Sequence, residues 1–302
     1  MRVLVAGATS VPGIPLLREL NARGHDVIGL TRSSAKTKQI STAGAKPMVG
    51  DVFNAAETAA LVAEIAPEVV ISLLTTLPKR GPMRPKDFQP AIALWDRGVP
   101  NLVTAAQHAR VRRVVAESVI FAYGYAPTGP PVMDEDDPYP GPPPRGGAKM
   151  LSSLRTMEQT VLSSGERSDT EGIVLRYGVF YGSGVPHSEM MARLAKWWVL
   201  PVPSGNGVLS WVEIGDVARA TAAVLDRGRS GQIYNIVDDR PRSFGNYARD
   251  LAARAKRPRP LTIPNRLVGL VAPYVAAAFG QAWLPLSNAK AKAELGWTPE
   301  ST

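Results

Sequence analysis

The chain has 302 residues, which is enough for one large domain or for two interleaved ones. Hydrophobic residues make up 45% of the chain and charged residues 20%, the balance of a soluble globular protein. The absence of cysteine excludes structural disulfides, thiolate catalysis and zinc sites built on cysteine. The three histidines His25, His108 and His187 have no metal-ligand spacing, so we expect no catalytic metal.

The net charge of +9 raises the question of polyanionic partners. Basic residues gather in RDLAARAKRPRP, 249–260, without interleaved aromatic residues or a known binding module, so we expect no nucleic-acid partner. The opening MRVLVAG lacks the three regions of a signal peptide, and we expect a cytoplasmic protein. The uncharged stretch 267–287 contains Pro273 and Pro285, which favours a buried or lid helix over membrane contact.

Apolar runs rich in β-branched residues alternate with helical patterns through the first half of the chain. The expected strands are 2–7, 25–31, 46–51, 68–74 and 112–118, and the expected helices are 13–23, 55–66 and a longer one that begins near Pro90. The strands are continuous apolar runs, as expected when helices cover both faces of a sheet. The alternation therefore predicts an α/β fold of the Rossmann type, with a doubly wound parallel sheet.

The second half of the chain is less regular. A loop rich in proline and glycine, 123–147, is too long for a connection in a compact core and predicts a functional surface loop. A helix at 145–159 and strands at 172–178 and 232–237 follow. We assign residues 1–177 and about 209–237 to a dinucleotide-binding domain, and about 178–208 and 238–302 to a smaller, interleaved substrate-binding domain.

The stretch VLVAGATSVPG, 3–13, is a strand followed by a glycine turn and a helix. Gly7 permits the tight turn, Gly13 permits close packing of helix on strand, and Ser10 occupies the middle place of the G-x-x-G-x-x-G spacing. The helix N-terminus offers free N–H groups to a pyrophosphate. The predicted cofactor contacts of this turn are Gly7, Thr9, Ser10, Val11, Pro12 and Gly13.

The end of the second expected strand indicates which dinucleotide binds. An NAD site usually places Asp or Glu there, for the ribose diol. This chain instead has Thr31, Arg32 and Ser33, followed by Lys36. A guanidinium is well shaped for a 2′-phosphate, so the sequence favours NADP(H) over NAD(H).

Several motifs in order resemble those of the extended short-chain dehydrogenase/reductases, the NAD(P)-dependent epimerase/dehydratase group. They are GATSVPG (7–13), GDV (50–52), ESVIFAYG (117–124), LRYGVFYGSGV (175–185), WVEIGDVARA (211–220) and SNAKAKAELGWTP (287–299). The resemblance covers nearly the whole chain and implies a nicotinamide cofactor. It adds Asp51, Val52, Leu73, Leu74, Thr75 and Tyr177 to the expected cofactor contacts.

The resemblance also implies a Tyr-x-x-x-Lys pair on the helix 145–159, but RGGAKMLSSLRTMEQ contains no tyrosine. Aligning on Lys149 puts Arg145 in the tyrosine's place. Aligning on Glu158 puts Met150 there and Leu154 in the lysine's place, and this second register is preferred. In either register the helix cannot supply the usual tyrosinate.

Other residues near the expected site could supply the acid and the substrate contacts. The candidate catalytic residues are Ser118, at the end of the fifth strand, Tyr123, and Lys149 as a cationic neighbour that would lower the pKa of a phenol. Glu117 and the acidic run 134–137 offer carboxylates. The candidate substrate-binding residues are Tyr125, Tyr181 and Trp211.

The sequence thus predicts an NADP(H)-dependent oxidoreductase that transfers hydride to or from a small carbonyl or alcohol with a non-standard acid. The alternative is a redox-neutral isomerase, lyase or cyclase, or a non-catalytic NADP-binding protein, on the same fold. Family members often pair through the helices that flank the fifth strand, so we expect a homodimer.

Fluorescence titration with NADPH and NADH tests the cofactor assignment. We predict tight binding of NADPH, much weakened by Arg32→Ala, because the substitution removes the cation that would face the 2′-phosphate. Binding of neither nucleotide would mean that Ser10 marks a decayed phosphate site.

Overall fold

The computed structural model describes residues 1–78, 81–125, 132–137, 147–205 and 207–300. Its centre is a parallel sheet of seven strands in the order β11-β6-β5-β4-β1-β2-β3. The strands are β1 Arg2–Ala6, β2 Asp26–Thr31, β3 Lys46–Val49, β4 Val69–Ser72, β5 Arg113–Val119, β6 Glu171–Tyr177 and β11 Ile233–Ile236. The order reverses between β1 and β4, which confirms the predicted doubly wound sheet.

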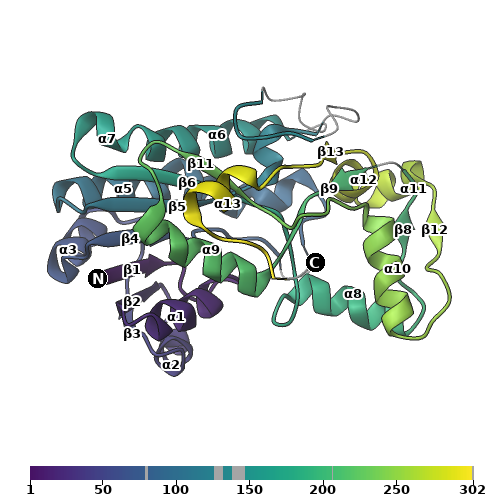
Figure 1. Cartoon of the computed structure of the whole chain (residues 1–302), viewed down its shortest axis with the longest axis horizontal. Helices are drawn as coiled ribbons and strands as arrows, with labels where there is room; N and C mark the ends of the chain where they lie inside the picture. The colour runs from purple at the N-terminus through teal and green to yellow at the C-terminus, as the bar shows by residue number, and fades with distance from the viewer. Residues whose placement is uncertain (79–80, 126–131, 138–146, 206, 301–302) are drawn as a thin grey trace.

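Two layers of helices cover the sheet and bury a hydrophobic core on each face (Figure 1). One layer consists of α1 Gly13–Ala22, α2 Thr37–Thr42, α9 Ile214–Arg227 and α13 Ala289–Leu295. The other consists of α3 Ala55–Ile65, α4 Gln89–Ala93, α5 Val99–His108 and α6 Ala148–Leu162, which the short α7 Ser164–Arg167 follows. The apolar strands predicted this arrangement, since both of their faces need cover.

The helix that the sequence predicts to begin near Pro90 forms as one long helix. In it, a π-helical segment, Leu94–Gly98, joins α4 to α5. Pro100 lacks an N–H and cannot bond the carbonyl of Asp96, so the ladder of hydrogen bonds is interrupted there. Single turns of 3-10 helix span Ser34–Lys36, Pro85–Phe88 and Ile120–Tyr123.

The remaining elements gather beyond the carboxyl ends of the central strands, to the right in Figure 1. They are α8 Pro186–Lys196, α10 Phe244–Arg254, α11 Asn265–Val271 and α12 Pro273–Gly280, with three parallel strand pairs: β7 Val179–Tyr181 with β10 Trp211–Glu213, β8 Val202–Pro203 with β12 Thr262–Ile263, and β9 Val208–Leu209 with β13 Trp283–Leu284. The chain leaves the sheet after β6 and returns through α9 and β11, so the two parts are interleaved. The exact division into domains stays a prediction.

The uncharged stretch 267–287 forms the end of α11, then α12 and β13, in place of one long helix. Pro273 begins α12, because its fixed φ suits a first helical turn and its missing N–H would have no partner there. Among the described residues, no helix is long and apolar enough to cross a membrane.

A buried ion pair joins α6 to the sheet. The Arg176 guanidinium on β6 donates to Glu158 on α6, from Nε to Oε1 at 2.9 Å and from Nη2 to Oε2 at 2.7 Å. Each side chain is only 2% exposed. The Ser118 hydroxyl on β5 donates to Glu158 Oε1 at 2.5 Å, and the Tyr123 ring lies under the guanidinium at 4.5 Å. These contacts fix α6 against β5 and β6.

We predict that Glu158→Ala lowers the free energy of unfolding by roughly 3–5 kcal/mol, because it leaves the buried Arg176 guanidinium without its counter-charge. Denaturant unfolding measures this change. Lys149→Ala is the matched control, since Lys149 pairs with Asp96 while 63% exposed, and a surface pair contributes about 0–1 kcal/mol. Equal losses in the two variants would contradict the prediction.

Candidate functional site

A cavity of about 1450 Å³ lies at the carboxyl ends of the central strands. It runs from the glycine turn after β1 to α8, α11 and α12, and therefore crosses the point where the strand order reverses. Ligand pockets usually enclose roughly 300–1,000 Å³, so this one can hold a dinucleotide and a second molecule together. Open α/β sheets bind their ligands at this place.

The glycine turn has the geometry that the sequence predicts. Gly7 has φ +81°, and a Cβ built there would lie 2.3 Å from the carbonyl oxygen of Leu73. A Cβ on Gly13 would lie 2.4 Å from the carbonyl oxygen of Ala8. Pro12, the N-cap of α1, places no capping side chain over the first turn, so no side chain competes with a ligand there, although the Gly13 N–H already donates to the Ser10 carbonyl oxygen at 3.1 Å.

Ser10 fits a phosphate group well. Its Oγ is buried, lines the cavity and has no hydrogen-bond partner among the described residues. An orphaned buried hydroxyl needs an explanation, and a pyrophosphate oxygen would supply the missing acceptor. The serine in the middle place of the turn therefore suits a dinucleotide.

The other predicted cofactor residues surround the same cavity. Those that line it are Gly7, Thr9, Ser10, Val11, Pro12, Thr31, Arg32, Ser33, Asp51, Val52, Leu73, Leu74, Thr75 and Tyr177. Gly13 lies just behind the turn, as the first residue of α1. Arg32 is exposed at the end of β2, and Arg18 and Lys36 line the same end of the cavity. That end of the cavity thus carries three cationic side chains.

The three predicted catalytic residues do not line the cavity, because their side chains make contacts elsewhere. Ser118 bonds Glu158 on the far face of the sheet, since neighbouring residues of a strand point to opposite faces. The Tyr123 hydroxyl lies 3.0 Å from the Asp134 carbonyl oxygen and 3.1 Å from Asn235 Oδ1, either of which can accept its one proton, and burial raises its pKa to about 12. Lys149 pairs with Asp96 at 2.7 Å on the surface. None of the three lines the cavity, and their assignment to catalysis stays a prediction.

The predicted substrate-binding residues also fall outside the lining. Tyr125 stacks on Phe121 with ring centroids 5.1 Å apart, so it supports a wall that Phe121 itself forms. Tyr181 donates to Asp238 Oδ2 at 2.8 Å. The Trp211 ring stacks on that of Tyr247 at 4.4 Å. These aromatic residues pack against other side chains outside the lining, and their assignment to substrate contact stays a prediction.

Helix α6 meets the cavity through Met150, while Leu154 is fully buried in the core. This placement fits the preferred register, in which Met150 stands where the family resemblance expects tyrosine. Arg145, the corresponding residue of the other register, lies outside the described residues, as does most of the proline-rich loop.

The half of the cavity away from the glycine turn is strongly apolar. Its lining includes Phe88, Leu94, Trp95, Val119, Phe121, Met150, Phe180, Met190, Met191, Leu194, Phe244, Leu267, Val268, Val271, Tyr274 and Phe279. In the described part of the chain, the lysine and arginine residues of the lining are Arg18, Arg32 and Lys36, all at the other end. The apolar half therefore suits an aromatic or otherwise poorly hydrated ligand.

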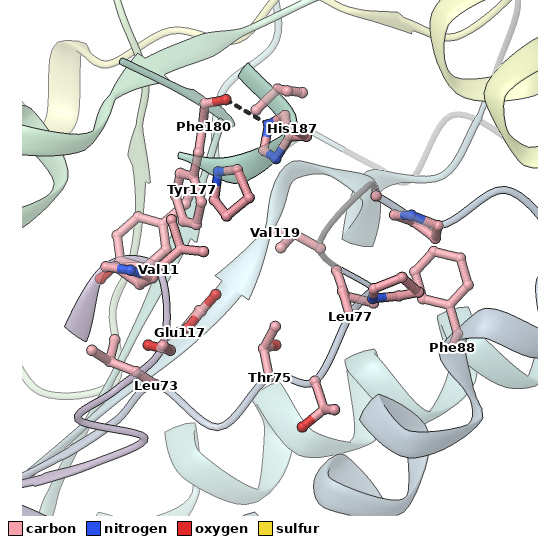
Figure 2. A pocket seen from close by; sticks show the side chains of 18 of the residues that line it. Val11, Leu73, Thr75, Leu77, Phe88, Glu117, Val119, Tyr177, Phe180 and His187 are labelled. Carbon is pink, nitrogen blue, oxygen red and sulfur yellow. Dashed lines mark hydrogen bonds between the residues drawn. The ribbon is translucent and has the colours of Figure 1, made fainter. Parts of the chain in front are cut away.

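Glu117 is an acid that lines the cavity. The sequence had indicated it only as one of several available carboxylates. It points from β5 into the cavity, where Leu73, Thr75 and Tyr177 surround it (Figure 2). Its side chain is buried, and Oε2 has no hydrogen-bond partner in the described structure. Burial raises the pKa of the carboxyl to about 8, so it is largely protonated at neutral pH. The signal in the sequence was a lone carboxylate inside an apolar strand.

His187 on α8 is the second titratable group that the sequence did not single out. Its Nε2 lies 2.8 Å from the carbonyl oxygen of Phe180, which fixes the ring at the cavity wall (Figure 2). Burial lowers the pKa of the imidazole, so the ring is neutral at pH 7. With Nε2–H donating to Phe180, Nδ1 is left as an acceptor.

Comparisons with known proteins agree with this geometry. The profile of the NAD dependent epimerase/dehydratase family matches residues 3–237. A 3-diazoavenalumate denitrifying reductase from a Streptomyces species is 35% identical over 99% of this chain and 96% of its own length. UDP-glucose 4-epimerase from Corynebacterium glutamicum is 24% identical over 100% of this chain and 92% of its own.

Solved structures share the fold. UDP-glucose 4-epimerase from Thermus thermophilus, in complex with NAD, superposes with a TM-score of 0.79 at 20% identity, over 100% of this chain and 95% of its own. DesIV, a dTDP-glucose 4,6-dehydratase from Streptomyces venezuelae with NAD bound, gives 0.79 at 19% identity, over 100% and 93%.

The buried carboxyl of Glu117 makes stability depend on pH. Its pKa is raised from 4.5 to about 8 in the folded chain, so the unfolded state loses this proton first, and stability falls as pH rises through that window. We predict that Glu117→Gln stabilises the protein above pH 8, by up to a few kcal/mol, and leaves it unchanged near pH 4. Denaturant unfolding at several pH values measures the difference. A gain that is the same at every pH would contradict the assignment.

Proposed function

Because the chain belongs to the NAD dependent epimerase/dehydratase family, we propose that it is an NADP(H)-dependent reductase of an apolar, electron-poor small molecule. The reaction we favour is the reductive removal of a diazo group, with hydrogen taking the place of the departing nitrogen. The observation that carries this proposal is an apolar substrate chamber without an activated tyrosine in its described lining.

Binding of the phosphorylated dinucleotide is supported by the cationic end of the cavity. Arg32 follows β2 directly, Lys36 lies one turn further on, and no acid follows β2 to hold a ribose diol. The structural relatives named above carry NAD, so the preference for NADP(H) is a proposal for this chain. When bound, the reduced nicotinamide would supply the hydride.

A nucleotide sugar is a poor fit to the other half of the cavity. A diphosphate needs cations or aligned amide groups, and the described residues that line this half include neither lysine nor arginine. Met190, Met191 and Phe279 instead offer soft, polarisable contacts to a flat ligand. This chemistry supports an aromatic substrate over the UDP-sugars that related enzymes take.

Reduction of a carbonyl leaves an alkoxide, which needs a proton from an activated acid. The two tyrosines of the described lining are poor donors, which leaves the buried carboxyl of Glu117 as the protonated acid there. Tyr177 shares a hydrogen bond with the Thr221 hydroxyl at 2.7 Å, and burial raises the pKa of Tyr177 and of Tyr274. Neither is assisted by a lysine, since Lys36 is the lysine of that lining and lies at the cofactor end.

Removal of a diazonium nitrogen has no such requirement. In the reaction Ar–N₂⁺ + H⁻ → Ar–H + N₂, the electron pair of the C–N bond leaves with dinitrogen, and the hydride provides the pair of the new C–H bond. The protein has only to hold the ring against the hydride donor and exclude water, and the apolar walls suit both tasks. The 35% identical denitrifying reductase makes this class of substrate the first choice.

The test is a reaction of 3-diazoavenalumate with NADPH that carries deuterium at the transferable position. We expect one NADPH oxidised per dinitrogen released, with deuterium on the carbon that lost the nitrogen. An aromatic aldehyde and UDP-glucose serve as controls, and deuterium on an alcohol carbon would identify a carbonyl reductase instead. Conversion of any of these substrates without net oxidation of NADPH would sink the reductase proposal in favour of redox-neutral chemistry.

A further inference from the structure

We propose that Glu117 makes the nicotinamide end of the cavity a proton-linked cation site. In this site the carboxyl gives up its proton to face the positively charged, oxidised ring, and keeps it when the neutral, reduced ring is bound. The inference rests on the proposed function, since it requires that the dinucleotide binds in the cavity.

The position of Glu117 follows from the alternation of β5. Ser118 turns to the α6 face, where it bonds Glu158, so its neighbour Glu117 must turn to the opposite face. There the carboxyl meets the cavity between the ends of β4 and β6, close to Leu73, Thr75 and Tyr177 (Figure 2).

The course of a dinucleotide brings its nicotinamide to this end. Arg32 and Asp51 lie at the ends of β2 and β3, where an adenosine would bind, and the glycine turn after β1 takes the pyrophosphate. The cavity then continues across the reversal of strand order to the ends of β4, β5 and β6. Glu117 is the acid that the described lining offers there.

The described residues that line the cavity with Glu117 offer its carboxylate no counter-charge. The β4 end contributes Leu73 and Thr75 and the glycine turn contributes Val11, none of which titrates. Tyr177 on β6 has its hydroxyl engaged with Thr221, and His187 on α8, further along the wall, is held at the carbonyl oxygen of Phe180. Arg176 lies on the opposite face of the sheet and pairs with Glu158.

Because the described residues provide no counter-charge for this carboxyl, a bound cationic ligand would be the first one. The free acid is held protonated at neutral pH by burial, which raises its pKa to about 8. Binding of the oxidised cofactor is then written E–COOH + NADP⁺ ⇌ E–COO⁻·NADP⁺ + H⁺, with mass and charge balanced. NADPH has an uncharged ring, so its binding displaces no proton from Glu117.

Two consequences follow from this linkage. The affinity for NADP⁺ rises with pH, by up to about tenfold per pH unit below pH 8, and levels off above it. The affinity for NADPH stays flat over the same range. The bound cofactor thus becomes a stronger hydride donor as pH rises, because its oxidised form is held more tightly.

Calorimetric titration of the full chain with NADP⁺ and with NADPH, at pH 6.5–9 in two buffers of different ionisation enthalpy, tests the inference. We expect close to one proton released per NADP⁺ bound at pH 7 and none per NADPH. Glu117→Gln should abolish the release, remove the pH dependence and weaken NADP⁺ binding at pH 8 by tenfold or more, while NADPH binding changes less than about threefold. Gln has the shape of the protonated carboxyl, which favours a folded variant.

Asp238→Asn is the matched control, because Asp238 is a second buried carboxyl with a raised pKa, about 6, that does not line the cavity. This variant should keep the proton release of the wild type. Release that persists in Glu117→Gln, or NADP⁺ affinity without pH dependence in the wild type, would overturn the inference while leaving the cofactor assignment intact. Binding of neither nucleotide would instead refute the proposed function itself.

Discussion

The buried ion pair between Glu158 and Arg176 decides how the site is built. Two opposite charges removed from water require each other and additional hydrogen bonds, and here Ser118 supplies one while the Tyr123 ring covers the guanidinium. The pair ties α6 to β5 and β6 on one face of the sheet. The pair thereby engages the Ser118 hydroxyl and the face of the Tyr123 ring, two of the residues that the sequence indicated for catalysis.

The same pair fixes what reaches the cavity. With Ser118 held on the α6 face, the alternation of β5 turns Glu117 to the cavity face, into walls of aliphatic and aromatic side chains. Helix α6 contributes Met150, a polarisable apolar residue, to the cavity wall, at the position where the preferred alignment expects the tyrosine of related enzymes. The apolar walls of the cavity support the proposed poorly hydrated hydride acceptor.

The opposite end of the cavity depends on a different constraint, the close approach of backbones. Gly7 and Gly13 bring the β1 turn against the carbonyls of Leu73 and Ala8, which leaves the first turn of α1 open to a ligand. Ser10 adds a buried hydroxyl that has no hydrogen-bond partner among the described residues. One cavity therefore joins a polar, cationic end to an apolar end. Glu117, the single buried acid of the described apolar lining, lies between the two ends.

The sequence by itself determined the doubly wound sheet, because continuous apolar strands alternating with amphipathic helices have few other ways to bury both faces. It also located the glycine turn, where Gly7 and Gly13 have a local backbone reason to be glycine. Only the tertiary structure decided which side chains of β5 and its continuation meet the ligand. Ser118 and Tyr123 follow Glu117 within six positions. The direction of Ser118 depends on Glu158, 40 residues away along the chain, and that of Tyr123 on Asn235, 112 residues away. Spacing along the sequence cannot reveal such a contact, because it forms only when α6 packs on the sheet.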